Sequence, residues 1–300
     1  MGEIMRKAAR HYRWLRTEGL ARLVEEDRLN PVDRLRVWLA KARWRRAANR
    51  PAGSAAAVFV VGVQRSGTNM LVRGLDRAPE VEVHNENDRR AFHAYRLRSD
   101  DVVRDIVARS RHEFVLFKPL CDSHRTAGLL ALGGPGTARA IWVYREVDGR
   151  VRSSVSKFGD SNLQALRRIA AGRGDTAWEA GGLEEPQIAL LRGMPLDSMT
   201  PESASALFWY LRNDLYFSTG LHRRDDVVLV SYDAFLAAPE ATMRALSSRI
   251  GFRYRQALVE GIAPRGAARP EQLQLDPRVR ELCDEMQMRL DADSRRTLAA

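Results

Sequence analysis

The chain has 300 residues and a mass of 33.9 kDa, and it is 45% hydrophobic and 29% charged. This composition excludes collagen-like, disulfide-rich and wholly disordered proteins. Its net charge of +11 is of the kind seen in nucleic-acid-binding proteins, yet residues 1–50 hold 14 Lys and Arg against 6 Asp and Glu. Residues 51–300 hold 35 against 32, so we expect a near-neutral body behind a basic extension, and no nucleic-acid partner.

Cysteine content and hydropathy indicate a cytoplasmic protein. Cys121 and Cys283 are too few for a disulfide framework and lack the spacing of metal ligands. The longest apolar run, Ala55 to Val63, is shorter than the ~20 residues that a membrane span needs. The charged N-terminus has no apolar segment behind it, so we expect neither a signal peptide nor a transmembrane helix.

Residues 1–54 are expected to form a basic helical extension with its linker. Asn30-Pro31 ends one helix and opens the next. In the second helix, Leu35 and Trp38 fall at helical spacing with arginines on the other side, which predicts an amphipathic helix. Such a helix packs on a protein core, or lies on an anionic membrane surface, which would place the protein peripherally at the inner face of a membrane.

From Ala55 onward, strand-like runs alternate with helix-like ones. The strand-like runs lack polar alternation, which indicates burial on both faces and hence a parallel sheet. We predict an α/β fold over residues 55–300, with three layers in which helices flank an open, P-loop-like parallel sheet. Residues 159–203 break the alternation and are interpreted as an insertion, either a lid over the substrate or a surface segment. The expected strands are residues 57–63, 113–117, 139–144 and 227–230, and the expected helices are 70–77, 125–132, 148–157 and 239–250.

The segment from Val58 to Leu71 carries the clearest chemical signal. It reads as a buried strand that runs through a glycine loop into a helix, where backbone N–H groups and the helix dipole favour an anion. Gly62 and Gly67 have P-loop spacing, but Thr68-Asn69 stands where Lys-Ser or Lys-Thr would follow. ATP or GTP hydrolysis is therefore disfavoured, whereas Arg65 supplies a cation for another oxyanion.

A second anion element follows the predicted strand at residues 139–144. Arg145 leaves the carboxyl end of that strand, and Ser153 lies eight residues on, about two helical turns into the next helix. Ligands bind at this edge of open α/β sheets. A guanidinium fork and a hydroxyl can hold one phosphate together.

These elements resemble those of sulfotransferases that use 3′-phosphoadenylyl sulfate (PAPS), particularly bacterial members. Residues 65–69 resemble the 5′-phosphosulfate loop of that family, and Arg145 with Ser153 resembles its 3′-phosphate element. Residues 228–240 resemble the later stretch that places a tyrosine, here Tyr232, near the adenine, and Arg265 corresponds to a reduced Arg-Lys-Gly element. The resemblance covers about residues 57–265. It implies a PAPS site made of Arg65, Ser66, Gly67, Thr68, Asn69, Arg145, Ser153, Tyr232 and Arg265.

The resemblance also implies the chemistry. A sulfuryl group would pass by in-line displacement to an acceptor hydroxyl, without a metal, and adenosine 3′,5′-bisphosphate would leave. Arg65 would stabilise the leaving oxygens, and Lys118, at a strand end, would line the pocket. Glu86 is the expected base, with His84, His93 and His124 as alternatives. We expect the acceptor on a glycan or glycolipid, although a small molecule would also fit.

Two other functions remain open from the sequence. A P-loop nucleotide kinase or other phosphotransferase would share the sheet and the anion loop. A basic protein that binds nucleic acid or a membrane surface would share the skew of charge toward residues 1–50.

Overall fold

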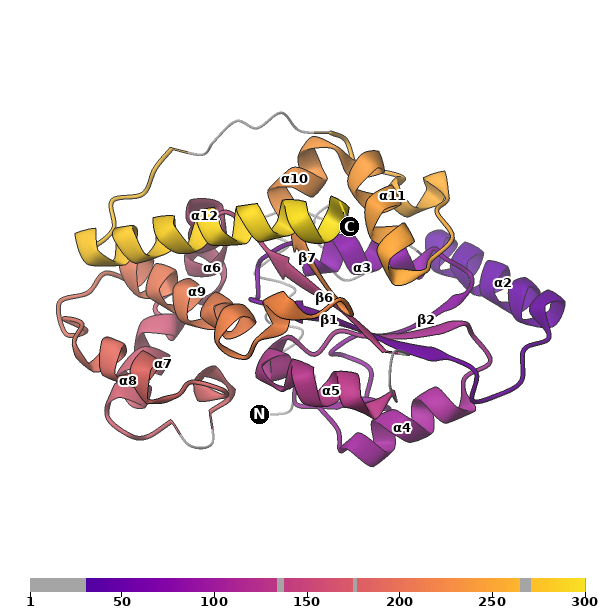
Figure 1. Cartoon of the computed structure of the whole chain (residues 1–300), viewed down its shortest axis with the longest axis horizontal. Helices are drawn as coiled ribbons and strands as arrows, with labels where there is room; N and C mark the ends of the chain where they lie inside the picture. Colours follow the sequence, from indigo (N-terminus) through magenta and orange to yellow (C-terminus); the bar gives the residue numbers. More distant parts are fainter. Residues whose placement is uncertain (1–30, 134–137, 175–176, 265–270, 300) are drawn as a thin grey trace. The chain divides into compact units, whose positions relative to one another are not determined.

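The computed structural model describes residues 31–133, 138–174, 177–264 and 271–299 (Figure 1). The chain divides into two compact units, Met1–Asn49 and Arg50–Ala300. In the first unit, helix α2 (Pro31–Ala48) begins at the proline predicted to open it. The helix expected before Asn30 lies outside the described residues. Among the described helices, none combines the length and the apolar character needed to cross a membrane.

The second unit is built on a five-stranded sheet of order β2-β5-β1-β6-β7 in which every neighbouring pair is parallel. All five strands therefore end at one edge of the sheet, which is where ligands bind in open α/β folds. The predicted parallel α/β fold is confirmed. The strands are β1 (Ala56–Gly62), β2 (Val81–His84), β5 (Phe114–Phe117), β6 (Arg139–Tyr144) and β7 (Val227–Ser231).

Burial on both faces explains the unbroken apolar character of the strands. Along β1, Phe59 and Val61 belong to one hydrophobic cluster, whereas Val58 and Val60 belong to the other. Because successive strand side chains point to opposite faces, β1, β5, β6 and β7 supply both clusters, whereas the apolar residues of β2 belong to the second. Figure 1 shows the strands between α3 and α11 on one side and α4 and α5 on the other.

The flanking helices fall into two groups by the cluster to which they contribute. The first cluster receives side chains from α4 (Asp100–Arg109), α5 (Thr126–Leu132), α6 (Val147–Phe158), α7 (Ser161–Ala170), α8 (Glu185–Arg192), α9 (Pro201–Ser218) and α12 (Pro277–Ala299). The second receives them from α3 (Thr68–Asp76), α10 (Tyr232–Ala237) and α11 (Pro239–Ile250). The layers on either side of the sheet are thus both helical, as expected.

The segment predicted as an insertion, residues 159–203, contributes to the core. It contains α7, α8 and the 3-10 helix η2 (Trp178–Ala180), and Leu166 and Leu191 are fully buried. Helices α4 and α12 were not predicted from the sequence, nor was the short antiparallel hairpin of β3 (Phe92–His93) and β4 (Arg96–Leu97). Cys121 and Cys283 are buried free thiols.

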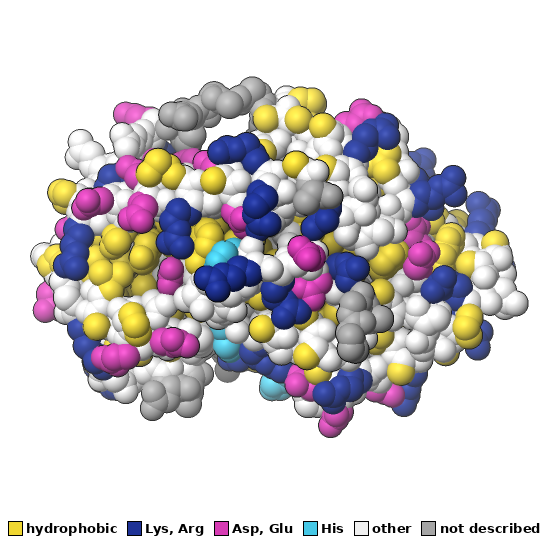
Figure 2. Space-filling view, viewed as in Figure 1, with side chains coloured by type: hydrophobic (Ala, Val, Ile, Leu, Met, Phe, Trp, Pro, Cys, Tyr) yellow, Lys and Arg dark blue, Asp and Glu magenta, His cyan; other side chains and the backbone are white. Residues whose placement is uncertain are grey.

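Charged side chains do not gather by sign on the face that Figure 2 shows. Lys and Arg are interspersed there with Asp and Glu, in keeping with the small net charge of residues 51–300.

Candidate active site

The glycine loop begins at Gly62, the last residue of β1, which pairs with Val143 of β6. Gly62 has a φ of 123°, and a Cβ at this position would lie 2.3 Å from the carbonyl oxygen of Val143. Only glycine fits so close an approach. The backbone N–H of Gly62 donates to the Oγ of Ser123 at 3.0 Å, which fixes the start of the loop from the 3-10 helix η1 (Leu120–Arg125).

Arg65 adopts a left-handed backbone conformation within the loop, with a φ of 70°. For a residue with a Cβ this costs about 1 to 2 kcal/mol, so surrounding contacts must hold it. Its Nε donates to the Oγ of Ser153 on α6 at 2.9 Å. The structure thus brings together two residues that the sequence analysis placed in separate anion elements.

Tyr232 lies directly against the loop from the carboxyl end of β7. A Cβ on Gly67, whose φ is 84°, would lie 1.9 Å from the Cδ2 of the Tyr232 ring. The guanidinium of Arg145 lies over the same ring, 5.1 Å from the ring centroid. Gly67, Tyr232 and Arg145 therefore form one contact series across the ends of β1, β6 and β7.

Two polar atoms in this region are buried without a hydrogen-bond partner among the described residues. They are the Oγ of Ser66, a fully buried side chain, and the Nε of Arg145. Buried donors of this kind cost free energy unless a ligand or water satisfies them. Helix α3 begins at Thr68 directly after Gly67 without a side-chain cap, so its first N–H groups are further donors. The set fits an anion with several oxygens.

Glu86 and Lys118 form an ion pair beside the loop. The Nζ of Lys118 lies 3.0 Å from the Oε2 of Glu86, and both side chains are largely buried. The same Nζ donates to the Oδ1 of Asn69 at 2.5 Å, at the start of α3. The carboxylate expected to act as base and the lysine expected to line the pocket are thus joined to the anion loop.

His84 is held by its surroundings on β2. It is 1% exposed, stacks on Phe117 at 5.2 Å, and its Nδ1 lies 2.8 Å from the Oδ2 of Asp88. Its Nε2 is 3.3 Å from a Glu82 carboxylate oxygen, without hydrogen-bond geometry. This arrangement favours a structural role for His84.

His93 and His124 are the other two candidate bases. His93 is exposed on the β3-β4 hairpin, and no hydrogen bond or ion pair among the described residues joins it to Glu86 or Lys118. His124 packs against the Gly181-Gly182 turn, and burial, together with the charge of Arg212, lowers its pKa to about 4. At neutral pH it is uncharged, but its basicity is then no greater than that of a carboxylate.

Arg150 is a residue of this region that the sequence analysis missed. It is 1% exposed on α6, and its Nε donates to the carbonyl oxygen of Gln64 in the loop at 3.2 Å. Helical spacing was the available signal, because Arg150 shares the apolar face of α6 with Val147 and Val151. A charged residue is rarely buried on the apolar face of a helix unless polar groups are bonded to it.

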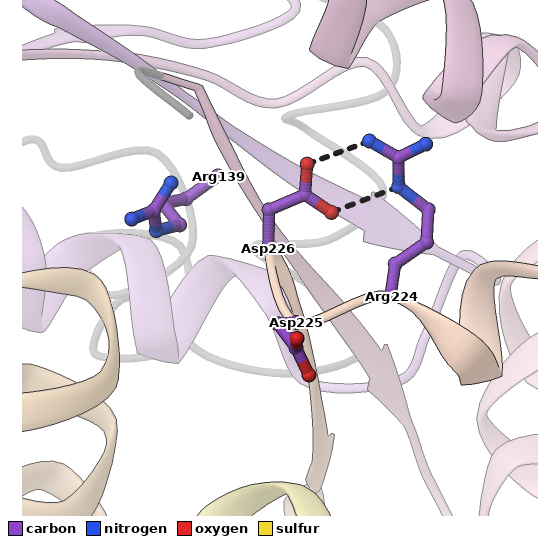
Figure 3. Close-up of a pocket in the computed structure, with 4 residues that line it drawn as sticks. All are labelled: Arg139, Arg224, Asp225 and Asp226. Atoms are coloured by element: carbon purple, nitrogen blue, oxygen red, sulfur yellow. Dashed lines mark hydrogen bonds and ion pairs between the residues drawn. The ribbon is translucent and has the colours of Figure 1, made fainter. Parts of the chain in front are cut away.

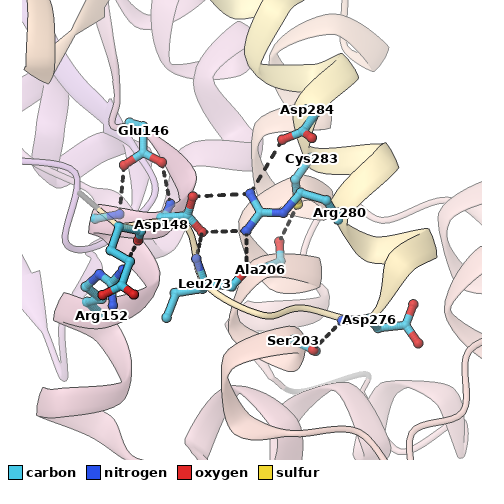
Figure 4. A network of polar contacts seen from close by, with 12 residues as sticks. Glu146, Asp148, Arg152, Ser203, Ala206, Leu273, Asp276, Arg280, Cys283 and Asp284 are labelled. Atoms are coloured by element: carbon cyan, nitrogen blue, oxygen red, sulfur yellow. Dashed lines mark hydrogen bonds and ion pairs between the residues drawn. The ribbon is translucent and has the colours of Figure 1, made fainter. Parts of the chain in front are cut away.

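Hydrogen bonds join the chain after residue 270 to the first turn of α6 (Figure 4). Asp148 accepts hydrogen bonds from Arg280 at 2.6 and 3.2 Å and from the N–H of Leu273 at 3.3 Å. Arg152 also donates to the carbonyl oxygen of Glu271. Arg265, expected to bind the nucleotide, lies outside the described residues.

A surface pocket lies at the opposite edge of the sheet (Figure 3). Arg139, Arg224, Asp225 and Asp226 line it at the amino ends of β6 and β7. Arg224 and Asp226 pair within it at 2.6 and 2.8 Å. Its lining includes none of the predicted site residues, and the paired charges satisfy each other.

Comparisons with known proteins find similarity only among solved structures. No family model and no curated protein sequence matches this chain. A sulfotransferase from Alicyclobacillus acidocaldarius is 16% identical over 79% of this chain and 95% of its own, with a TM-score of 0.44. The sulfotransferase domain of the Synechococcus PCC 7002 olefin synthase is 13% identical over 82% of this chain and 94% of its own, with a TM-score of 0.38. At this degree of similarity, function has to be argued from the chain's own residues.

Proposed function

We propose that this protein is a sulfotransferase that takes a sulfuryl group from PAPS and transfers it to an acceptor hydroxyl. The observation that carries the proposal is the contact between Arg65 and Ser153, at 2.9 Å. Beside it lie the Ser66 Oγ and the Arg145 Nε, which have no hydrogen-bond partner in the part of the chain that the structure describes. A P-loop kinase would need a lysine after Gly67, where this chain has Thr68. In this chain the cations are instead Arg65, within the loop, and Arg145, which follows the neighbouring strand β6.

The donor nucleotide would lie across the ends of three strands. Its 5′-phosphosulfate would take the N–H and side-chain donors of residues 65–69, and its 3′-phosphate would take Arg145 and Ser153. Support for a single ligand comes from Gly67 and Arg145, which both lie against the ring of Tyr232. Tyr232 would lie near the adenine, and we also assign Arg265 to the nucleotide.

In the reaction, the acceptor oxygen attacks sulfur while the bond between sulfur and the bridging phosphate oxygen breaks. The acceptor proton passes to the Glu86 carboxylate, and the electron pair of the broken bond stays on adenosine 3′,5′-bisphosphate. Arg65 and Lys118 would stabilise the charge that develops on the leaving phosphate. The 3.0 Å ion pair between Lys118 and Glu86 supports these separate roles. Lys118 supplies a positive charge, and Glu86 as a carboxylate can accept a proton.

The acceptor and the place of action are further parts of the proposal. We assign the acceptor hydroxyl to a glycan or glycolipid and the protein to the cytoplasm. The basic extension before Pro51 would then hold it peripherally at the inner face of a membrane, since residues 1–50 carry 14 of the 49 Lys and Arg.

A thermal shift experiment tests the donor. The protein is melted alone, with adenosine 3′,5′-bisphosphate, and with ADP or GDP plus magnesium. Selective binding raises the melting temperature because the ligand stabilises only the folded state. We expect the bisphosphate to stabilise most; stabilisation by ADP or GDP alone would replace the proposal with a nucleotide phosphotransferase.

A further inference from the structure

Arg150 is a cation in the interior of the protein, and its hydrogen-bond acceptors among the described residues are all neutral oxygens. Its Nη1 donates to the carbonyl oxygen and to the Oγ of Ser205 on α9, both at 2.8 Å. Its Nε donates to the carbonyl oxygen of Gln64 at 3.2 Å, and its guanidinium lies 5.5 Å from the ring centroid of Phe208. One side chain of α6 therefore joins the anion loop to α9.

The Gln64 carbonyl belongs to the peptide that precedes Arg65. The orientation of this peptide is coupled to the φ of Arg65, which has the left-handed value of 70°. Arg65 in turn directs its Nε toward Ser153, one helical turn beyond Arg150 on α6. The hydrogen bond from Arg150 to Gln64 thus helps to fix the conformation of Arg65, the residue proposed to contact the leaving phosphate.

The charge of Arg150 has no counter-charge nearby. No carboxylate of the described residues lies within ion-pair distance of it, and the charge that acts on it most strongly is that of Arg65. Burial first, and the charge of Arg65 second, lower the pKa of Arg150, which means that the protein interior disfavours its charged form. A bound anion at the loop would offset that cost.

A polar network keeps the anchor of Arg150 in place. The Oγ of Ser205 also accepts from the Nδ2 of Asn162 on α7 at 3.0 Å. The same Nδ2 lies 3.3 Å from the Oγ of Ser154, back on α6. Three helices therefore fix the side chain that contacts Gln64.

We propose that Arg150 is a positioning residue of the anion site, holding the peptide between Gln64 and Arg65 so that Arg65 meets Ser153 and the bound phosphate. The inference rests on the proposed function for the identity of the ligand. The positioning itself concerns any oxyanion that the loop binds.

A double-mutant cycle tests whether Arg150 acts through Arg65. The variants are Arg150→Met, Arg65→Ala and their combination, and calorimetry measures the Kd for adenosine 3′,5′-bisphosphate. We expect Arg150→Met to weaken binding about tenfold in the wild-type background and less than about twofold in the Arg65→Ala background. Equal losses in both backgrounds, or no loss in the wild-type background, would overturn the proposal.

Arg212→Met is the matched control. Arg212 is another buried guanidinium, 3% exposed, and donates to the carbonyl oxygen of Gly181 at 2.6 Å rather than to the loop. We expect it to lower the melting temperature as Arg150→Met does while the Kd stays within about twofold. If Arg150→Met does not fold, Arg150→Lys takes its place, because one ammonium retains the charge but cannot span both Gln64 and Ser205.

A second probe separates the two proposals. If wild-type protein binds inorganic pyrophosphate but not adenosine 3′,5′-bisphosphate, the proposed donor is wrong, and the cycle with pyrophosphate still decides the role of Arg150. If it binds neither probe, both proposals fail.

Discussion

The Nε of Arg65 donates to the Oγ of Ser153 at 2.9 Å although 88 positions separate the two residues. The sheet explains the contact, because β1 and β6 are parallel neighbours in which Gly62 pairs with Val143. The loop after β1 and the helix after β6 must then start side by side. Ser153 can accept from Arg65 and still donate its own proton to a bound oxyanion.

Replacing Ser153 by Ala should weaken binding of adenosine 3′,5′-bisphosphate by about tenfold, since Arg65 loses an acceptor and the ligand a donor. Calorimetric titration measures the change. Ser156→Ala is the control, because Ser156 is exposed on the same helix. An unchanged Kd in the Ser153 variant would remove Ser153 from the site.

Replacing Gly67 by Ala should abolish measurable nucleotide binding. The new Cβ would meet the Tyr232 ring at 1.9 Å, and the φ of 84° would become strained. Tyr232 has to move, and its contact with Arg145 moves with it. Titration with adenosine 3′,5′-bisphosphate and the melting temperature report the two effects.

Gly220→Ala separates the strain from the steric conflict. Gly220 has a φ of 75°, but a Cβ there would meet no atom within 4 Å. We expect this variant to lose about 1 kcal/mol of stability while its nucleotide affinity stays unchanged. Normal binding by the Gly67 variant would show that Tyr232 is not held against the ligand.

The sheet and the loop could be predicted because their signals are local. Unbroken apolar runs such as residues 57–63 specify buried strands, and Gly62 and Gly67 mark the turn between strand and helix. The boundaries agree with the structure within about two residues, as for Pro239–Ile250. Strand order, by contrast, follows from side-chain packing between segments far apart in the chain.

The parts of the site that escaped prediction depend on contacts made only in the fold. Arg150 faces inward, but its acceptors are Gln64 and Ser205, 86 and 55 positions away. The sequence offers three histidines as bases, whereas only the structure distinguishes the stacked His84 from the exposed His93. Periodicity can show which face is buried, but not which polar atoms meet there.

Acid should destabilise the turn that carries Glu86. Burial by itself would raise the pKa of Glu82, but its close contact with His84, a hydrogen bond from Ser110 and electrostatic attraction to His84 and His112 outweigh it, so the pKa falls from 4.5 to about 2. For Asp88, burial is likewise outweighed, chiefly by bonds from Arg90 and His84, and its pKa falls from 3.8 to about 2. Both carboxylates have folded pKa values below their unfolded ones. Their stabilisation is present above about pH 4.5 and is lost as the pH falls toward 2.

Urea unfolding across this pH range measures the effect. The free energy of unfolding of Glu82→Gln should be lower than that of the wild type at neutral pH, and the two should converge as the pH falls toward 2. Glu240→Gln, which removes an exposed partner of Arg244, should keep the wild-type pH dependence. A Glu82 variant that tracks the wild type at every pH would show that the His84 cluster does not stabilise the fold.

Replacing Glu86 by Gln tests the proton acceptor. The amide retains an oxygen for Lys118, now at 3.0 Å from the carboxylate, but cannot take the acceptor proton. We expect transfer of labelled sulfate from PAPS to a panel of hydroxyl acceptors to fall by about 10²- to 10⁴-fold, the usual contribution of a general base. The Kd for adenosine 3′,5′-bisphosphate should stay unchanged, because none of the assigned nucleotide contacts is lost.

The histidine variants complete this test. His93→Ala and His124→Ala should retain transfer, since His93 is exposed and His124 is a weak base whose pKa is about 4. Normal transfer by Glu86→Gln together with loss in His124→Ala would move the base to η1. In that case the acceptor hydroxyl would have to approach from the side of the Gly181-Gly182 turn, against which His124 packs.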